Sequence, residues 1–203
     1  MSRFKPALVL AAIAAIVSAL VIITYNITYV DTSNVLTKKQ AAAVISVYGG
    51  TEEDYSVVSA EVWQPAFEAS DYEDLSRVTK VIKKNDGVLA FEVTVKGYKE
   101  GYTLLVGVDK GAVAGVAVVS TGEETPNLGT KTAAPDYLEQ FKGYDKPVTI
   151  VTAEPKNDGE IQAVTGATYS SKGVAKAVNI ALEAYHLCVQ QVNFNTDGGG
   201  EAE

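Results

Sequence analysis

Four stretches of the chain decide the fold: VTKVI at residues 78–82, VLAFEVTV at 88–95, YTLLVGV at 102–108 and VAGVAVVS at 113–120. They are rich in β-branched and aromatic residues, which favour extended strands. Residues 85–87 (NDG) and 109–111 (DKG) lie between neighbouring stretches and are typical of hairpin turns. Strands joined by such short turns pair in antiparallel fashion. The sequence therefore predicts an α+β fold, a single domain with an antiparallel sheet and flanking helices.

The flanking helices are predicted from caps and periodicity. Thr32, Ser33 and Asn34 are candidate N-caps for a helix through residues 41–45 that closes at Gly49-Gly50. Residues 135–142 predict a short helix, and residues 148–152 predict another strand. After residue 171, one helical face carries Val174, Val178, Ala181, Leu182 and Tyr185. Residues 51–75 mix acidic groups with Trp63 and Phe67 and receive no assignment.

The N-terminal segment is apolar. No charged residue occurs from Pro6 to Val30, which is long enough for a membrane-spanning helix of roughly 20 residues. Arg3 and Lys5 precede it, so we expect the N-terminus to be cytoplasmic and the rest of the chain to be extracytoplasmic. The alternative is a cleaved signal peptide with Val17-Ser18-Ala19 as its cleavage site, but this site lies inside the apolar run.

These patterns predict five segments along the chain. They are a cytoplasmic N-terminus at 1–6, a transmembrane helix at 7–30, a helical stand-off segment at 31–50, an extracytoplasmic domain at 51–190 and a disordered acidic tail at 191–203. The lipid bilayer is therefore an expected partner, and the cell membrane is the expected location.

Composition excludes several kinds of site and partner. The 17 basic and 25 acidic side chains give a net charge of −8, which argues against nucleic acid as a partner. A single cysteine, Cys188, allows neither a disulfide framework nor a cysteine-ligated iron–sulfur cluster within the chain. A single histidine, His186, leaves no metal-ligand cluster. Any redox centre must then be organic or belong to a partner.

The stretch VTGATYSS at residues 164–171 places hydroxyl groups and a glycine just before the last amphipathic run. The start of a helix offers free N–H groups and the positive end of the helix dipole to an anion. Gly166 allows close approach of the backbone, and Thr168 presents a hydroxyl beside that anion site. Taken alone, the motif is also compatible with Ser170 or Ser171 acting as a plain N-cap.

The tetrapeptide at 165–168 resembles the flavinylation motif of the FMN-binding domains in the Rnf and Nqr electron-transport complexes. The segment Glu124-Thr125-Pro126-Asn127-Leu128-Gly129 resembles the Glu-Thr-Pro-Gly-Leu-Gly segment of the same family, with Asn127 in place of glycine. Asparagine tolerates a left-handed backbone, which allows the turn to persist. The resemblance extends from the apolar segment to Leu187, and the chain length is closer to the G subunit of Rnf than to the longer C subunit of Nqr.

The resemblance implies that FMN is joined to Thr168 by a phosphoester and that the chain relays electrons. The complex would move electrons between ferredoxin and NAD and couple this to transport of Na⁺ or H⁺. Its other subunits and a flavin transferase are the implied partners. No catalytic residue or metal ligand is expected in this chain. Expected contacts to the flavin ring are Glu124, Thr125, Leu128 and Gly129, and expected contacts to the phosphate are Thr165, Gly166, Ala167, Ser170 and Ser171.

One position departs from the family. Relatives usually carry an acidic residue where this chain has Gln162, and a carboxylate there would assist attachment of the flavin. Asp158 and Glu160 are close enough in sequence to compensate. Two other functions remain open: a membrane-anchored, non-redox domain that binds a small anionic ligand, and a stand-alone covalent-FMN protein that feeds an extracellular reductase. Absorbance of the purified protein separates the first of these from a flavoprotein, and genome neighbours separate the second from Rnf.

Overall fold

The structure, a computed structural model, describes residues 4–28 and 34–191. The chain divides into two compact units, residues 1–32 and 33–203. The first unit contains one helix, α1 (Phe4–Thr28). Among the fully described residues, no helix is long and apolar enough to cross a membrane. Parts of three predicted segments lie outside the described residues: 1–3 of the cytoplasmic N-terminus, 29–30 of the transmembrane helix and 192–203 of the tail. The candidate caps Thr32 and Ser33 also lie outside them.

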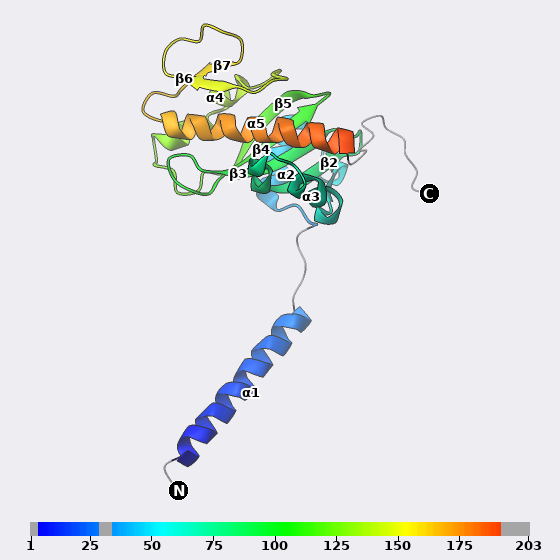
Figure 1. The fold of residues 1–203 in the computed structure, drawn as a ribbon, viewed down its shortest axis with the longest axis vertical. Helices are drawn as coiled ribbons and strands as arrows, with labels where there is room; N and C mark the ends of the chain where they lie inside the picture. Colours follow the sequence, from blue (N-terminus) through cyan, green and yellow to red (C-terminus); the bar gives the residue numbers. More distant parts are fainter. Residues whose placement is uncertain (1–3, 29–33, 192–203) are drawn as a thin grey trace, which may run out of the picture. The chain divides into compact units, whose positions relative to one another are not determined.

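The second unit is built on a five-stranded antiparallel sheet whose strands pair in chain order (Figure 1). The strands are β1 (Tyr55–Val58), β2 (Val78–Lys84), β3 (Leu89–Val95), β4 (Tyr102–Asp109) and β5 (Ala112–Ser120). This confirms the predicted sheet and adds β1, which comes from the unassigned segment. Lys110 and Gly111 join β4 to β5 with φ angles of 50° and 85°. These are the two left-handed positions of a type I′ hairpin.

Helices cover both faces of the sheet. The long helix α5 (Thr168–Gln191) crosses one face, as Figure 1 shows, and α2 (Lys38–Tyr48) packs on β4 and β5. Successive residues of a strand point to opposite faces. Phe91 and Val93 accordingly pack in the cluster that contains α5, whereas Ala90 packs in a second cluster with Val44 of α2. All five apolar residues predicted on one face of α5 are buried, which confirms that prediction.

Helix α2 belongs to the globular unit, which corrects the prediction of a stand-off segment at 31–50. Thr37 caps it, rather than the residues at 32–34: the Thr37 hydroxyl accepts a hydrogen bond from the Gln40 amide at 3.4 Å, and Gln40 Oε1 accepts one from the Thr37 amide at 2.9 Å. The helix ends at Gly49, as predicted. The buried side of α2 includes small residues such as Ala41 and Ala43. Alanines give only a weak apolar pattern, so the sequence did not predict that α2 packs in the core.

The remaining elements complete the edges of the unit. The unassigned segment 51–75 and the two residues after it form a 3-10 turn, η1 (Glu52–Asp54), the strand β1, the helix α3 (Ala60–Glu68) and a second 3-10 turn, η2 (Glu73–Arg77). Trp63 and Phe67 of α3 are buried in the core. The short helix α4 (Pro135–Glu139) and the strand β6 (Thr149–Val151) confirm the elements predicted at 135–142 and 148–152. Strand β7 (Glu160–Gln162), which pairs in parallel with β6, was not predicted.

Candidate functional site

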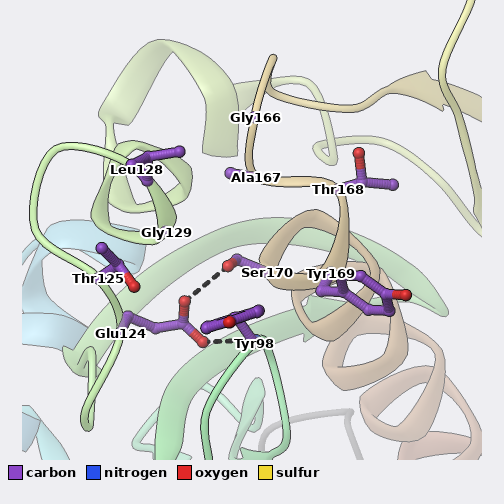
Figure 2. A pocket seen from close by; sticks show the side chains of 10 residues that line it. All are labelled: Tyr98, Glu124, Thr125, Leu128, Gly129, Gly166, Ala167, Thr168, Tyr169 and Ser170. Carbon is purple, nitrogen blue, oxygen red and sulfur yellow. Dashed lines mark hydrogen bonds between the residues drawn. The ribbon is translucent and has the colours of Figure 1, made fainter.

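Three segments that are far apart in the sequence meet at one pocket (Figure 2). They are the loop after β3, the loop after β5 and the start of α5. The two loops that the sequence singled out, 124–129 and 164–168, therefore lie together. The lining residues are Tyr98, Glu124, Thr125, Leu128, Gly129, Gly166, Ala167, Thr168, Tyr169 and Ser170.

Glu124 forms the base of this arrangement. Its side chain is 5% exposed, and its carboxylate accepts three hydrogen bonds. The amides of Tyr98 and Lys99 donate to Oε1 at 2.7 and 3.1 Å, and the Ser170 hydroxyl donates to Oε2 at 2.6 Å. A buried carboxylate requires such donors, because it has lost its hydration. Glu124 thus joins all three segments of the pocket, as the dashed lines in Figure 2 show.

The 124–129 loop is held in a tight turn. Asn127 has a φ of 61°, which confirms that asparagine serves here in a left-handed position. The Leu128 amide donates to the Thr125 carbonyl at 3.2 Å. At the far end of the turn, the Thr132 hydroxyl donates to the Gly129 carbonyl at 2.7 Å. Tyr102 must then donate to Thr132 across 2.9 Å, in keeping with burial that raises the pKa of Tyr102 to about 12.

The second loop contacts the first through Gly166 and Leu128. Gly166 has a φ of 79°, a conformation that residues with a side chain rarely adopt. A Cβ atom at this position would also lie 3.0 Å from Leu128 Cδ2. Glycine is therefore required at 166 for two reasons, its backbone angle and the close approach of Leu128.

Thr168 is the first residue of α5 and is half-buried. Figure 2 shows it on the opposite side of the pocket from Glu124 and Thr125. Amides in the first turn of a helix have no partner within the helix. The amides of Thr168, Tyr169 and Ser170 occupy that position beside the Thr168 hydroxyl. A hydroxyl and a set of helix-start amides, which suit an anion, thus lie at one rim of the pocket.

Most of the predicted contact residues line the pocket, and two do not. Thr165 is exposed outside it. Ser171 is fully buried beneath the loop, where its hydroxyl accepts a hydrogen bond from the Val164 amide at 3.0 Å. Ser170 and Ser171 both lie within the first turn of α5 and are not N-caps, because the helix starts at Thr168. Ser171 therefore braces the loop instead of facing a ligand.

Tyr98 and Tyr169 were not predicted as site residues from the sequence. Their rings are 58% and 67% exposed, and their centroids lie 6.4 Å apart with an interplanar angle of 56°. Leu128, on another side of the pocket, is 44% exposed. Exposed apolar side chains that gather around one pocket mark a binding site. The only available signal was their position, since Tyr98 follows Gly97 after a strand and Tyr169 follows Thr168.

Glu160 and Gln162 lie on β7. The Glu160 carboxylate accepts hydrogen bonds from the amides of Lys156 and Asn157 and from the Asn157 side chain, and these bonds lower its pKa. It is therefore engaged within its own loop. Gln162 is exposed. Away from the pocket, Cys188 is buried, and burial raises the pKa of its thiol to about 12. This thiol is protonated at neutral pH and therefore unreactive.

Comparison with known proteins identifies the domain. Residues 97–183 match the sequence profile of the FMN-binding domain. This range includes all three segments of the pocket. All ten residues that line the pocket fall within this matched segment.

Three relatives are named as components of oxidoreductase complexes. The chain is 36% identical to the G subunit of the proton-translocating ferredoxin:NAD(+) oxidoreductase complex of Clostridium ljungdahlii, over 50% of this chain and 56% of that protein. It is 31% identical to the G subunit of the Na(+)-translocating ferredoxin:NAD(+) oxidoreductase complex of Acetobacterium woodii, over 51% and 52%. In both alignments the chain spans about half the length of the relative. It is 29% identical to the G subunit of the ion-translocating oxidoreductase complex of Methanosarcina acetivorans, over 78% of this chain and 94% of that protein.

The pocket fits the two ends of an FMN molecule. Six large apolar side chains are exposed among the described residues of the globular unit: Val35, Val62, Tyr72, Tyr98, Leu128 and Tyr169. Three of these six border the pocket, where a flat aromatic ring would cover them. The amides at the start of α5 suit a phosphate. The match of residues 97–183 to the FMN-binding domain supports FMN as the cofactor.

Proposed function

We propose that this chain carries FMN covalently on Thr168 and relays electrons as the G subunit of an Rnf-type complex, an ion-translocating ferredoxin:NAD oxidoreductase. One observation carries the proposal. The half-buried Thr168 hydroxyl lies at the rim of a pocket that has helix-start amides beside it and exposed apolar side chains around it. The alignment with the named G subunits supports the same role.

In this proposal one side of the pocket binds the FMN phosphate and the other binds the flavin ring. The first amides of α5 bind the phosphate, and Leu128, Tyr98 and Tyr169 bind the flavin ring. An exposed helix start stabilises a phosphate by only about 0.3–1 kcal/mol. This is too little to retain a cofactor outside the cell, so the covalent bond retains it. When bound, FMN supplies a centre that accepts and donates electrons, which the protein holds and tunes.

Attachment requires an activated flavin donor and a transferase. We propose that Thr168 Oγ1 forms a bond to the FMN phosphorus of a flavin dinucleotide. The pyrophosphate P–O bond to adenosine monophosphate breaks, and the hydroxyl proton passes to solvent. The structure's contribution is to leave this hydroxyl accessible at the start of α5, where neighbouring amides stabilise the charge that remains on the diester.

The proposal includes a membrane topology and a set of partners. We infer that residues 7–30 anchor the chain, that the N-terminus is cytoplasmic and that residues from 31 onwards lie outside the cytoplasm. The uncharged run from Pro6 to Val30 and the preceding Arg3 and Lys5 motivate this topology. The other subunits of the complex are the proposed redox partners, and the coupled ion is Na⁺ or H⁺, as in the names of the two relatives.

Replacement of Thr168 tests the attachment. Thr168→Val keeps the shape of the side chain and removes the hydroxyl, so the protein should fold normally and carry no flavin that survives denaturation. Thr165→Val is the matched control in the same loop and should retain flavin. Both variants are made with the transferase, and the mass of the peptide spanning residues 161–172 is measured. An FMN-sized increment on that peptide in the Thr168→Val protein would show that the acceptor is another residue.

Protease accessibility tests the topology. Protease added to intact protoplasts or spheroplasts should digest the globular unit, because it is proposed to face outwards. A cytoplasmic protein of the same cells serves as the control for membrane integrity. Survival of the globular unit until the membrane is broken would overturn the proposed orientation.

A further inference from the structure

We propose that Glu124 is a positioning residue for flavin attachment, which fixes the first turn of α5 against the loop after β3 before any flavin is present. This inference rests on the proposed attachment at Thr168. The family resemblance had predicted that Glu124 contacts the flavin ring directly. In the structure both of its carboxylate oxygens are engaged by the protein, through the amides of Tyr98 and Lys99 and the hydroxyl of Ser170.

The carboxylate fits into a space that only glycines leave open. A Cβ atom on Gly129 would lie 1.9 Å from Glu124 Oε2, and one on Gly97 would lie 2.3 Å from Oε1. Neither distance is possible, so any side chain at 97 or 129 would displace Glu124. Neither glycine has a positive φ, so the absence of a side chain, not backbone freedom, explains glycine at these two positions.

A third glycine brings the helix to the same place. A Cβ atom on Gly173 of α5 would lie 3.1 Å from the Cα atom of Gly97 and from the carbonyl oxygen of Lys96. The first turn of α5 and the loop after β3 therefore approach almost backbone to backbone. Glu124 bridges this close approach, because it binds the two amides that follow Gly97 and the hydroxyl three residues before Gly173.

The bridge determines where Thr168 points. Thr168 lies two residues before Ser170 in the same helical turn, so an anchored Ser170 fixes the backbone from which the Thr168 hydroxyl projects. The same bridge also holds the Tyr98 backbone beside Tyr169. A residue that holds a reacting group in its reactive geometry in advance can raise the rate of a step without itself contacting the reacting atoms. Glu124 acts in this way, through Ser170 and Tyr98.

Four variants of the full-length chain separate this role from a purely structural one. Glu124→Ala removes all three hydrogen bonds. Glu124→Gln keeps an oxygen for the two amides, and its NH₂ group can donate to the Ser170 hydroxyl, so it keeps the bridge without the charge. Ser170→Ala removes only the link to α5. Glu123→Ala, at the exposed neighbouring carboxylate, is the matched control.

The first measurement is made on protein without flavin. Hydrogen exchange of the Tyr98 and Lys99 amides should accelerate in Glu124→Ala and remain slow in Glu124→Gln, Ser170→Ala and Glu123→Ala. The second is the rate of attachment by purified transferase from a flavin dinucleotide, at varied concentrations of each acceptor protein. In Glu124→Ala and Ser170→Ala we expect kcat to fall roughly tenfold, as expected for the loss of a charge-assisted hydrogen bond. KM for the acceptor should change little, and Glu124→Gln should recover most of kcat.

Two results would overturn the inference: attachment to Ser170→Ala at the wild-type kcat, or an effect of Glu124→Ala that Glu124→Gln shares in full. If circular dichroism shows that Glu124→Ala is unfolded, the comparison of Glu124→Gln with Ser170→Ala decides. Failure of the proposed function has a different signature. The wild-type chain would then gain no flavin at Thr168, while the exchange rates in the flavin-free protein would still report whether Glu124 joins the two segments.

Discussion

Among the described residues two glutamates, Glu92 and Glu124, are buried, and the protein supports them in different ways. Glu92 lies within β3 and is 7% exposed, against 5% for Glu124. The side chains of Gln40, on α2, and Thr79, on β2, donate to it at 2.6 and 2.7 Å. The Glu124 carboxylate instead accepts hydrogen bonds from two loop amides and from the hydroxyl of Ser170.

The difference shows what a buried carboxylate can be used for. Both sites satisfy the requirement that a buried charged group be hydrogen-bonded. The donors to Glu92 come from regular elements that the two hydrophobic clusters already hold, so this carboxylate joins a helix to the sheet. Two of the donors to Glu124 come from a loop and the third from the start of α5, so this carboxylate shapes a pocket. Changes around Glu92 should therefore reduce stability, and changes around Glu124 should alter the site.

Replacement of Glu92 should have the largest effect on stability. Glu92→Leu leaves the Gln40 side-chain amide without its acceptor, and it leaves the Thr79 hydroxyl only the longer bond to the carbonyl of residue 92, at 3.3 Å. We expect a loss of about 3 kcal/mol in the free energy of unfolding, measured with urea. Flavin content per folded molecule should not change. Glu92→Gln, which keeps one acceptor oxygen, is the control and should lose less. A Glu92→Leu protein as stable as the wild type, or one with an altered flavin spectrum, would contradict the contrast between the two carboxylates.

A methyl group on the α2 side of the sheet should have the next largest effect. A Cβ atom on Gly107 would lie 2.6 Å from Val47 Cγ1 and 2.8 Å from the Tyr48 ring, so Gly107→Ala forces α2 to move. We expect a loss of about 2 kcal/mol, the range seen for overpacked cores. Gly115, its partner on β5, is the control, because a Cβ atom there would lie 3.2 Å from Val47 Cγ1. Equal losses of stability in Gly107→Ala and Gly115→Ala would mean that the shorter distance between Gly107 and Val47 does not limit the packing of α2 on the sheet.

Loss of the Ser171 hydroxyl should have a smaller and local effect. Ser171→Ala removes the acceptor of the Val164 amide, a bond that braces the loop before Thr168. We expect about 1 kcal/mol less stability and faster hydrogen exchange at Val164. Ser170→Ala is the comparison, since the Ser170 hydroxyl bonds Glu124 and not Val164. Fast exchange at Val164 in both variants would show that the two serines act as one unit.

The smallest expected effect is at an ion pair between η2 and α5. Burial raises the pKa of Asp74, but the hydrogen bonds and charges of Lys176 and Arg77 outweigh it and hold this pKa below the ordinary 3.8. A lowered pKa in the folded state stabilises the protein above pH 3.8, and this contribution is lost as the pH falls through the folded value.

Asp74→Asn should therefore reduce stability by less than about 1 kcal/mol at pH 7, because the pair is partly exposed. The difference from the wild type should shrink below pH 3.8. Asp71→Asn, at an exposed carboxylate nearby, is the control. A difference that grows on acidification would mean that the ion pair does not lower the pKa of Asp74.

The sequence predicted the parts of the fold that have strong patterns. Alternation and turn residues identified β2 to β5, and apolar periodicity identified α5. The role of α2 was missed because alanines supply much of its buried face, and alanine contributes little to an apolar pattern. The tight turn at Asn127 was anticipated from the tolerance of asparagine for left-handed angles, whereas β7 is only three residues long and carries little signal.

The two loops of the site could be predicted from the sequence, but the hydrogen bonds that hold them together could not. Family resemblance identified residues 124–129 and 165–168, and the structure brings these loops together. The partners of Glu124 could not be predicted, because two of them are backbone amides, which every residue except proline carries. Tyr98 and Tyr169 escaped notice because an exposed aromatic residue in a loop, or at the first turn of a helix, follows no periodicity. Their approach within 6.4 Å depends on the packing of α5 against the β3 loop.

The order of the elements along the chain has a consequence for biosynthesis. All five strands of the sheet are made before α5, and each pairs with a strand next to it in chain order, so the sheet can form before α5 is complete. Helix α5 comes last, and it carries Thr168, Tyr169 and Ser170. A chain that stops before residue 168 contains the whole sheet and lacks the acceptor hydroxyl. Attachment at Thr168, as proposed, would therefore mark only those molecules whose synthesis has passed the sheet and whose last helix has docked on it.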